Sequence, residues 1–238
     1  AAVALIRFAY DWDWPAAERA FRRAIELNPS AVRTRVWYAI ALSTRRRPDE
    51  AIAQLGEVRR LDPLSVSAGN DLAMVLYYAR RYDEAMAHAT RALQANPTLT
   101  VGHVLRGECL VARGDYEAAI GEFRKAVDPS ARISLVLGRL GRALALAGRR
   151  EEARALLAQI EAAPLQSGTP NTEMAFVRAG LGDKNGAVAS LERALAAREG
   201  EALFIGVAPA FDGLRGDARF DALLRRMGLE PRGTPPRP

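Results

Sequence analysis

Six alanines recur along this chain at a constant interval of 34 residues: Ala17, Ala51, Ala85, Ala119, Ala153 and Ala187. Two further columns of mostly apolar residues keep the same interval, one placed four residues after each alanine and the other seven residues after it. Positions separated by four and seven residues lie on one face of a helix. A repeat of this length predicts stacked helical hairpins, each of which buries a face against its neighbours.

A column of mostly small residues precedes the alanines by twelve positions: Leu5, Ala39, Ala73, Gly107, Gly141 and Ala175. Small side chains on both helices of a hairpin allow the two helix axes to approach closely. Pro29, Pro63 and Pro97 follow at the same interval and are expected to end the second helix of the first three units, because proline cannot continue a helix. In the second unit, the pattern predicts helices over about 32–44 and 49–61.

The combination of these columns resembles the tetratricopeptide repeat, as in RRYDEAMAHATRALQANP (80–97) and ARGDYEAAIGEFRKAV (112–127). The resemblance covers roughly residues 1–196 and implies an all-α fold, a right-handed α-solenoid of about six helix–turn–helix units. The period is interpreted as stopping after Gly200. Residues 197–228 are expected to form a helical cap, in which Phe204, Phe211, Leu214, Phe220 and Leu223 cover the sixth unit. Residues 229–238 are expected to be a disordered tail.

A narrower resemblance concerns residues 10–29, 135–157 and 208–229, which are similar to C-terminal repeat arrays of bacterial multidomain signalling proteins. In that group the array follows a winged-helix domain, a class III nucleotide cyclase or a Ser/Thr kinase. The resemblance implies a regulatory segment. The chain starts inside an apolar helix, which we interpret as a cut through a longer protein.

Composition argues against several classes of function. Cys109 is the single cysteine, so neither a disulfide framework nor a thiolate metal site is expected. The two histidines, His88 and His103, have no recognisable nucleophile or metal-ligand partner in the sequence. No apolar run approaches the roughly 18 residues that a membrane span needs. The sequence therefore predicts a cytoplasmic protein without catalytic activity, cofactor or metal.

In tetratricopeptide arrays the first helix of each unit lines a concave surface on which ligand peptides lie. By register, the resemblance implies a partner-binding groove for a peptide or helix of another protein. Large aromatic, methionine and arginine side chains beside isolated polar groups suit such a surface. The residues expected to form it are Trp37, Ile40, Asn70, Asp71, Met74, Tyr77, Tyr78, Glu108, Arg139, Arg142 and Phe176.

Two alternatives remain open. The turns between the paired helices carry a ridge of cations: Arg45, Arg46, Arg47, Arg80, Arg81, Arg113, Arg149 and Arg150. Each of these could simply complement the end of its own helix, or the ridge could contact an anionic partner. Nucleic acid is a weak candidate for that partner, because no aromatic residues interleave the ridge to stack on bases. The other alternative is a homo-oligomer that brings attached effector domains together.

Overall fold

The computed structural model describes residues 1–63, 66–127, 136–162 and 170–231. Six hairpins follow one another, each made of a first helix, here called helix A, and a second helix, helix B. The elements of the hairpins are α1 (Ala2–Ile6) with the π-helix η1 (Arg7–Asp11), α2 (Trp14–Leu27), α3 (Val32–Thr44), α4 (Pro48–Leu61), α5 (Val66–Tyr78), α6 (Tyr82–Ala95), α7 (Thr100–Arg113), α8 (Tyr116–Ala126), α9 (Leu137–Leu146), α10 (Arg150–Ala162), α11 (Asn171–Leu181) and α12 (Lys184–Ala196). Two 3-10 helices, η2 (Gly200–Phe204) and η3 (Pro209–Leu214), and α13 (Ala218–Arg226) complete the described chain.

The alanine column lies inside the hairpins, as the sequence predicts. All six alanines are at most 2% exposed. The column twelve residues earlier faces them: Ala39, Ala73 and Ala175 are 0% exposed, and Gly107 and Gly141 are buried. The predicted helices of the second unit appear as α3 and α4, with a difference of one residue at a single end.

In the fourth unit, a large side chain on α8 faces a glycine on α7. A Cβ atom added to Gly107 would lie 2.6 Å from Cε1 of Phe123, which is 0% exposed. Phenylalanine therefore occupies space on α8 that only a glycine on α7 leaves free. This close fit positions the two helices against each other.

The first unit departs from the predicted register. Its helix A changes from α-helical to π-helical geometry over η1, which adds one residue to the turn. Ala4 and Phe8 are consequently the buried residues, while Leu5 is only partly buried. Ala4, rather than the predicted Leu5, thus occupies the small-residue position of this unit.

The turn between helix A and helix B has the same backbone conformation throughout the described chain. A residue with positive φ occurs there at an interval of 34: Trp12, Arg46, Arg80, Gly114, Gly148, Gly182 and Gly216. Glycine is the residue that adopts this left-handed conformation without a steric penalty. The last member lies between η3 and α13, so the turn period extends beyond Gly200, where the sequence pattern predicts its end.

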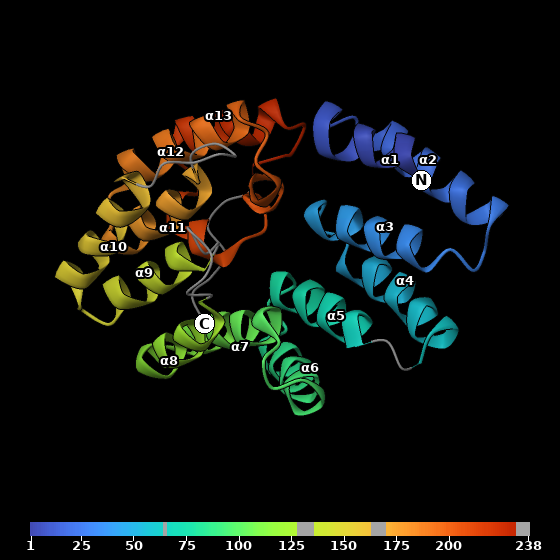
Figure 1. The fold of residues 1–238 in the computed structure, drawn as a ribbon. Coiled ribbons are helices and arrows are strands. Elements are labelled where there is room, and N and C mark those ends of the chain that lie inside the picture. The colour runs from blue at the N-terminus through green and yellow to red at the C-terminus, as the bar shows by residue number, and fades with distance from the viewer. Residues whose placement is uncertain (64–65, 128–135, 163–169, 232–238) are drawn as a thin grey trace.

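The stack of hairpins closes into a ring (Figure 1). Within the C-terminal segment, defined here as residues 200–231, η2 and η3 lie inside the curve, whereas α13 lies on the rim beside α12 and next to the first unit. A single hydrophobic cluster contains Phe8 and Trp14 together with Phe220 and Leu224. The two ends of the described chain therefore share one core.

The C-terminal segment has a wider role than the predicted cap. Phe211 does cover the sixth unit, where it stacks on Phe176 at 5.0 Å between ring centroids. Phe204, however, stacks on Tyr78 of the third unit at 4.9 Å. Leu229, at the start of the expected tail, is 7% exposed and belongs to the core. Residues 232–238 lie outside the described chain.

Candidate interaction surface

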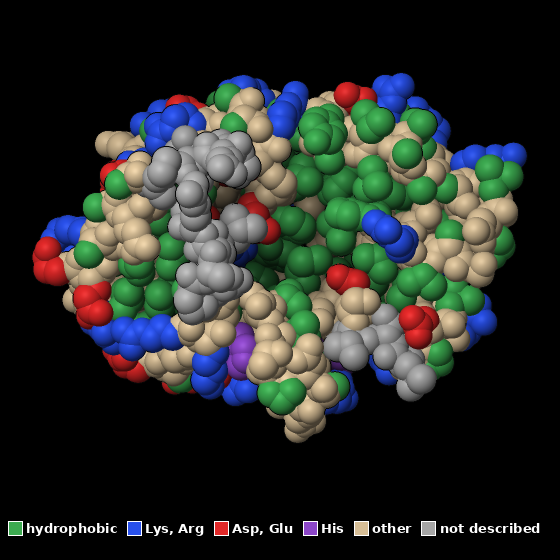
Figure 2. Space-filling model, in the orientation of Figure 1, with side chains coloured by type: hydrophobic (Ala, Val, Ile, Leu, Met, Phe, Trp, Pro, Cys, Tyr) green, Lys and Arg blue, Asp and Glu red, His purple; other side chains and the backbone are tan. Residues whose placement is uncertain are grey.

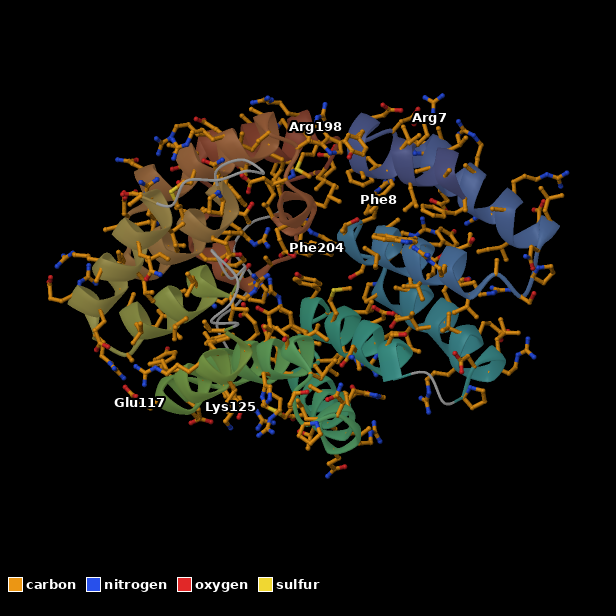
Figure 3. The ribbon with its side chains drawn as sticks, in the orientation of Figure 1. Arg7, Phe8, Glu117, Lys125, Arg198 and Phe204 are labelled. Carbon is orange, nitrogen blue, oxygen red and sulfur yellow. The ribbon has the colours of Figure 1, made fainter. Side chains whose placement is uncertain are left out.

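Side chains of the first three units bind the C-terminal segment. The indole Nε1 of Trp14 donates a hydrogen bond to the carbonyl oxygen of Met227. Arg46 Nη2 donates to the carbonyl of Gly206 at 2.8 Å, and Arg80 Nη2 lies 2.9 Å from Asp212 Oδ1. Figure 3 shows Phe204 within the ring and Arg198 close to the first unit, where its guanidinium lies 3.8 Å from the Trp12 ring centroid. The segment is thus attached to several units at once.

This arrangement covers part of the predicted groove. Tyr78 stacks on Phe204, and Phe176 stacks on Phe211. Arg139 Nη2 lies 2.7 Å from Glu201 Oε2 of η2. These three predicted groove residues therefore contact the chain's own C-terminal segment.

A buried charge cluster lies beneath that contact. Arg139 also reaches Glu173 Oε1 at 3.0 Å and Glu108 Oε1 at 3.3 Å, and its side chain is 11% exposed. Arg142 Nη1 lies 3.4 Å from Glu108 Oε2, which also accepts a hydrogen bond from the Tyr77 hydroxyl at 2.8 Å. Tyr77, Glu108 and Arg142 are therefore partners inside the ring wall.

Glu173 has the most perturbed environment in this charge cluster. It is 1% exposed, and its Oε2 accepts the backbone N–H of Gly138 at 2.8 Å. Burial raises the pKa of Glu173 to about 8, and the neighbouring carboxylates of Glu201 and Glu108 add to the effect against the opposing charge of Arg139. The cluster contains three carboxylates and two guanidinium groups, so one proton on Glu173 balances its charge.

The remaining predicted groove residues lie on helices α3 and α5. Trp37, Asp71 and Met74 are partly exposed, whereas Ile40 is 8% and Asn70 6% exposed. Figure 2 shows this face of the molecule hollowed near the middle of the ring, with hydrophobic side chains on the side formed by these helices. This part of the concave face is open to a ligand.

A pocket of about 390 Å³ opens between α5 and the start of α7. It is lined by Ser67, Asn70, Asp71, Met74, Asn96, Leu99 and Val101. Asn70 Oδ1 is buried and accepts no hydrogen bond within the described structure. Asp71 forms no ion pair with any described residue, and burial alone raises the pKa of its carboxyl to about 6. The pocket thus combines two acceptor groups with apolar walls.

The arginines of the predicted ridge have partners within the chain. Arg46 and Arg80 bind the C-terminal segment, as described above. The others pair locally: Arg45 with the Trp14 ring, Arg47 with Glu18 and Glu50, Arg81 with Glu84, Arg113 with Asp83, Arg149 with Glu152 and Glu117, and Arg150 with the carbonyl of Leu181. Each arginine of the ridge thus has a partner within the described structure.

His103 serves as a structural link. Its Nδ1 lies 2.8 Å from Glu122 Oε2 and its Nε2 lies 2.9 Å from the carbonyl of Pro97, so the ring joins the start of α7 to α8.

Cys109 is buried, and its burial raises the thiol pKa to about 12. No three His, Cys, Asp or Glu side chains among the described residues are grouped so that they could hold a metal ion. None of the helices in the described part of the chain is long and apolar enough to cross a membrane.

The fold and the open concave face define an α-solenoid, the class of scaffold in which stacked hairpins present an extended surface. The family model of the tetratricopeptide repeat matches residues 10–51 and 39–100. The hairpins beyond residue 100 repeat the same geometry to the end of α12. Proteins of this repeat class generally mediate protein–protein interaction, and their fold is generally a non-catalytic scaffold.

Solved structures show the same fold. PilW, described as a widely conserved type IV pilus biogenesis factor, is 18% identical with a TM-score of 0.61, over 82% of this chain and 90% of PilW. TTC0263, a thermophilic tetratricopeptide repeat protein of Thermus thermophilus, is 20% identical with a TM-score of 0.57, over 76% of this chain and 99% of its own. A tetratricopeptide repeat protein of Parabacteroides merdae is 15% identical with a TM-score of 0.53, over 94% of this chain and 91% of the other protein. No curated protein matches this sequence.

The sequence could not have shown which groove residues remain accessible. Register places them on the concave face but does not reveal that the C-terminal segment returns to that face. One signal was nevertheless present. Gly114, Gly148, Gly182 and Gly216 keep the 34-residue interval and extend the turn pattern beyond the last hairpin.

Proposed function

We propose that this protein is a non-catalytic interaction module that binds a peptide or helix of a partner protein on the open part of its concave face. The single observation that carries the proposal is the pocket at α5 and α7, where Asn70 Oδ1 accepts no hydrogen bond and Asp71 has no ion pair with a described residue. A buried polar group without a partner is costly, and a ligand that satisfies it gains affinity. The groove residues proposed for this contact are Trp37, Ile40, Asn70, Asp71 and Met74.

Rigidity of the scaffold supports tight binding. The concave face is built from helices whose spacing is set by buried alanines and glycines, and the ring is closed by the C-terminal segment. A surface that is already ordered loses little conformational entropy when a ligand binds. Met74 lines the pocket, and the partly exposed Trp37 of α3 adds apolar contact area on the same proposed groove.

Peptide selection tests this function. A random dodecapeptide library is displayed on phage and selected against the intact chain, and the affinities of the recovered peptides are measured by calorimetry. Trp37→Ala and Met74→Ala are expected to weaken binding at least tenfold, which corresponds to about 1.4 kcal/mol. The control is Leu27→Ala, which truncates a side chain that is 70% exposed on α2 and should leave affinity unchanged. Failure to recover peptides, or recovery of peptides that bind all variants equally, would reject the function.

We further propose that this binding serves regulation within a larger bacterial signalling or transcription protein. That step rests on the resemblance of the repeats to C-terminal arrays of such proteins. Its test is the sequence of the full natural polypeptide. A winged-helix, cyclase or kinase domain in that polypeptide would support the step, and its absence would reject it.

A second candidate function is self-association through the first helix. Val3, Ile6 and Tyr10 are 62%, 53% and 60% exposed, although large apolar side chains of the other hairpins are mostly buried. Light scattering over a range of concentrations tests this candidate. Mass that rises with concentration in the wild type but not in Ile6→Glu would support it, and a strictly monomeric chain would reject it.

A further inference from the structure

We propose that the pocket between α5 and α7 receives a basic side chain of the partner, a lysine or an arginine, whose charged end binds Asn70 and Asp71. The inference rests on the proposed function and specifies the chemistry of the ligand. It follows from the donor and acceptor groups that line the pocket, from its apolar walls and from its local charge.

The polar groups of the pocket are suited to a donor. Asn70 is 6% exposed and offers a carbonyl oxygen without a hydrogen bond. Asp71 follows it on the same helix and offers a carboxylate without an ion pair among the described residues. An ammonium or guanidinium group has only donors, so it can satisfy both oxygens at once.

The walls are suited to an aliphatic stem. Met74 lies one helical turn after Asn70 and Asp71, and Leu99 and Val101 face the pocket from the start of α7. Val101 is 41% exposed, which leaves apolar surface available for contact. Lysine and arginine bury their methylene stems against such surfaces while the charged end reaches a polar group. A volume of about 390 Å³ accommodates either side chain.

The negative charge of the Asp71 carboxylate outweighs two effects that oppose the binding of a cation. The start of α7 carries the positive end of a helix dipole, but this amounts to about half an elementary charge against the full charge of the Asp71 carboxylate. The chain as a whole has a net charge of +6. At physiological ionic strength, charges beyond about 8 Å are screened, so the partly buried carboxylate dominates within the pocket.

The burial of Asp71 explains why a cation is preferred over other ligands. Burial of this carboxyl without a neighbouring positive group raises its pKa to about 6, so it is ionised at neutral pH and lacks a counter-ion. A neutral side chain would leave that charge unpaired, and an acidic side chain would add repulsion. A basic side chain removes both penalties.

The test uses blocked pentapeptides in which a central lysine, arginine, norleucine, glutamine or glutamate is flanked by alanines. Binding to the intact chain is followed by NMR through ¹³C-labelled methionine methyl groups. Met74 reports on the pocket, while Met86, Met174 and Met227 are internal controls. The lysine and arginine peptides are expected to shift the Met74 signal with at least tenfold higher affinity than the other three.

Protein variants complete the experiment. Asp71→Asn keeps the shape of the side chain and is expected to weaken lysine binding at least tenfold, to the level of norleucine. Asn70→Leu should weaken it as well. Asp62→Asn removes an exposed carboxylate at the end of α4 and serves as the matched control with unchanged affinity. Thermal unfolding of each variant verifies that the fold is retained.

Several results would overturn the inference. Equal affinity for lysine and norleucine peptides, or lysine binding that persists in Asp71→Asn, would show that charge is not recognised; preference for glutamate would instead identify an anion site at the start of α7. If library peptides bind in a manner that depends on Trp37 and Met74 but not on Asp71, the interaction function stands and this inference fails. If neither library peptides nor pentapeptides bind, both fail.

Discussion

Arg139 lies among three carboxylates, those of Glu108, Glu173 and Glu201, and its guanidinium is 4.7 Å from the Phe176 ring centroid. Each carboxylate comes from a different helix, so one side chain joins α7, α9, α11 and η2. The sequence places Arg139 and Glu108 on the concave face, but it cannot reveal their pairing, because they belong to different units and the geometry depends on how units stack. Removing a partner from such a cluster leaves buried charge uncompensated.

Replacement of Arg139 by methionine tests this role. The variant keeps side-chain length but removes the cation shared by the buried Glu108 and Glu173 and the partly exposed Glu201, so the free energy of unfolding is expected to fall by about 3–5 kcal/mol. Urea unfolding followed by circular dichroism measures the change. Arg154→Met, at a surface pair with Glu151, is the control and should change stability by less than about 0.5 kcal/mol. Equal effects of the two substitutions would contradict the role of the cluster.

Glu173 predicts a specific dependence of stability on pH. Its pKa is raised to about 8 in the folded chain from an ordinary value of 4.5, so the folded state holds a proton that the unfolded state releases. The stabilising contribution of protonated Glu173 to the free energy of unfolding is therefore fully present below about pH 4.5. It is lost as the pH rises towards 8, at no more than about 1.4 kcal/mol per pH unit. Glu173→Gln mimics the protonated form and should gain stability relative to the wild type across this window. Parallel curves for the two proteins in urea titrations from pH 5 to 9 would refute the assignment.

At the scale of the helices, the sequence pattern was sufficient to locate the hairpins. The 34-residue interval determines which residues face each other, and α3 and α4 begin or end within one residue of the predicted limits. The π-helical turn of the first unit could not be predicted, because the pattern assumes a constant 3.6 residues per turn. The backbone itself, rather than the side-chain pattern, moves the buried position from Leu5 to Ala4.

The close contact of α7 with α8 gives a prediction at this scale. Gly107→Ala places a methyl group against the Phe123 ring and is expected to lower the free energy of unfolding by about 1–3 kcal/mol through overpacking. Phe123→Leu alone should also destabilise the chain, because it leaves a cavity. The double variant should be more stable than the sum of the two losses predicts, as measured in a double-mutant cycle by urea unfolding. Strict additivity would indicate that the two residues do not share this space.

At the scale of the whole molecule, the closed ring is the feature that the sequence did not predict. Curvature of a repeat array results from small rotations added from unit to unit, and residue spacing does not encode their size. The aromatic residues of the segment after Gly200 were recognised as a cover, but the pattern offered only the adjacent sixth unit as their target. The structure adds the third unit, through Phe204, and the first unit, through α13.

Weakening of the closure should be measurable by hydrogen exchange. In the double variant Arg46→Ala and Arg80→Ala, the C-terminal segment loses the guanidinium contacts to Gly206 and Asp212. Amides of η3 and α13 are expected to exchange at least tenfold faster, while those of α8 and α10 keep their rates. The control is Arg81→Ala with Arg149→Ala, which removes exposed local pairs and should leave exchange in the segment unchanged.

The contact of Trp14 with Met227 also has a consequence for the order of folding. These residues are 213 positions apart in the chain, whereas the helices of one hairpin are immediate neighbours. Local pairs form rapidly, and a junction between remote segments carries a large entropic cost of loop closure, so it is expected to form last. Substitutions at this junction should consequently accelerate unfolding while hardly slowing refolding. Separation of the two ends of the chain would then be the first step of unfolding.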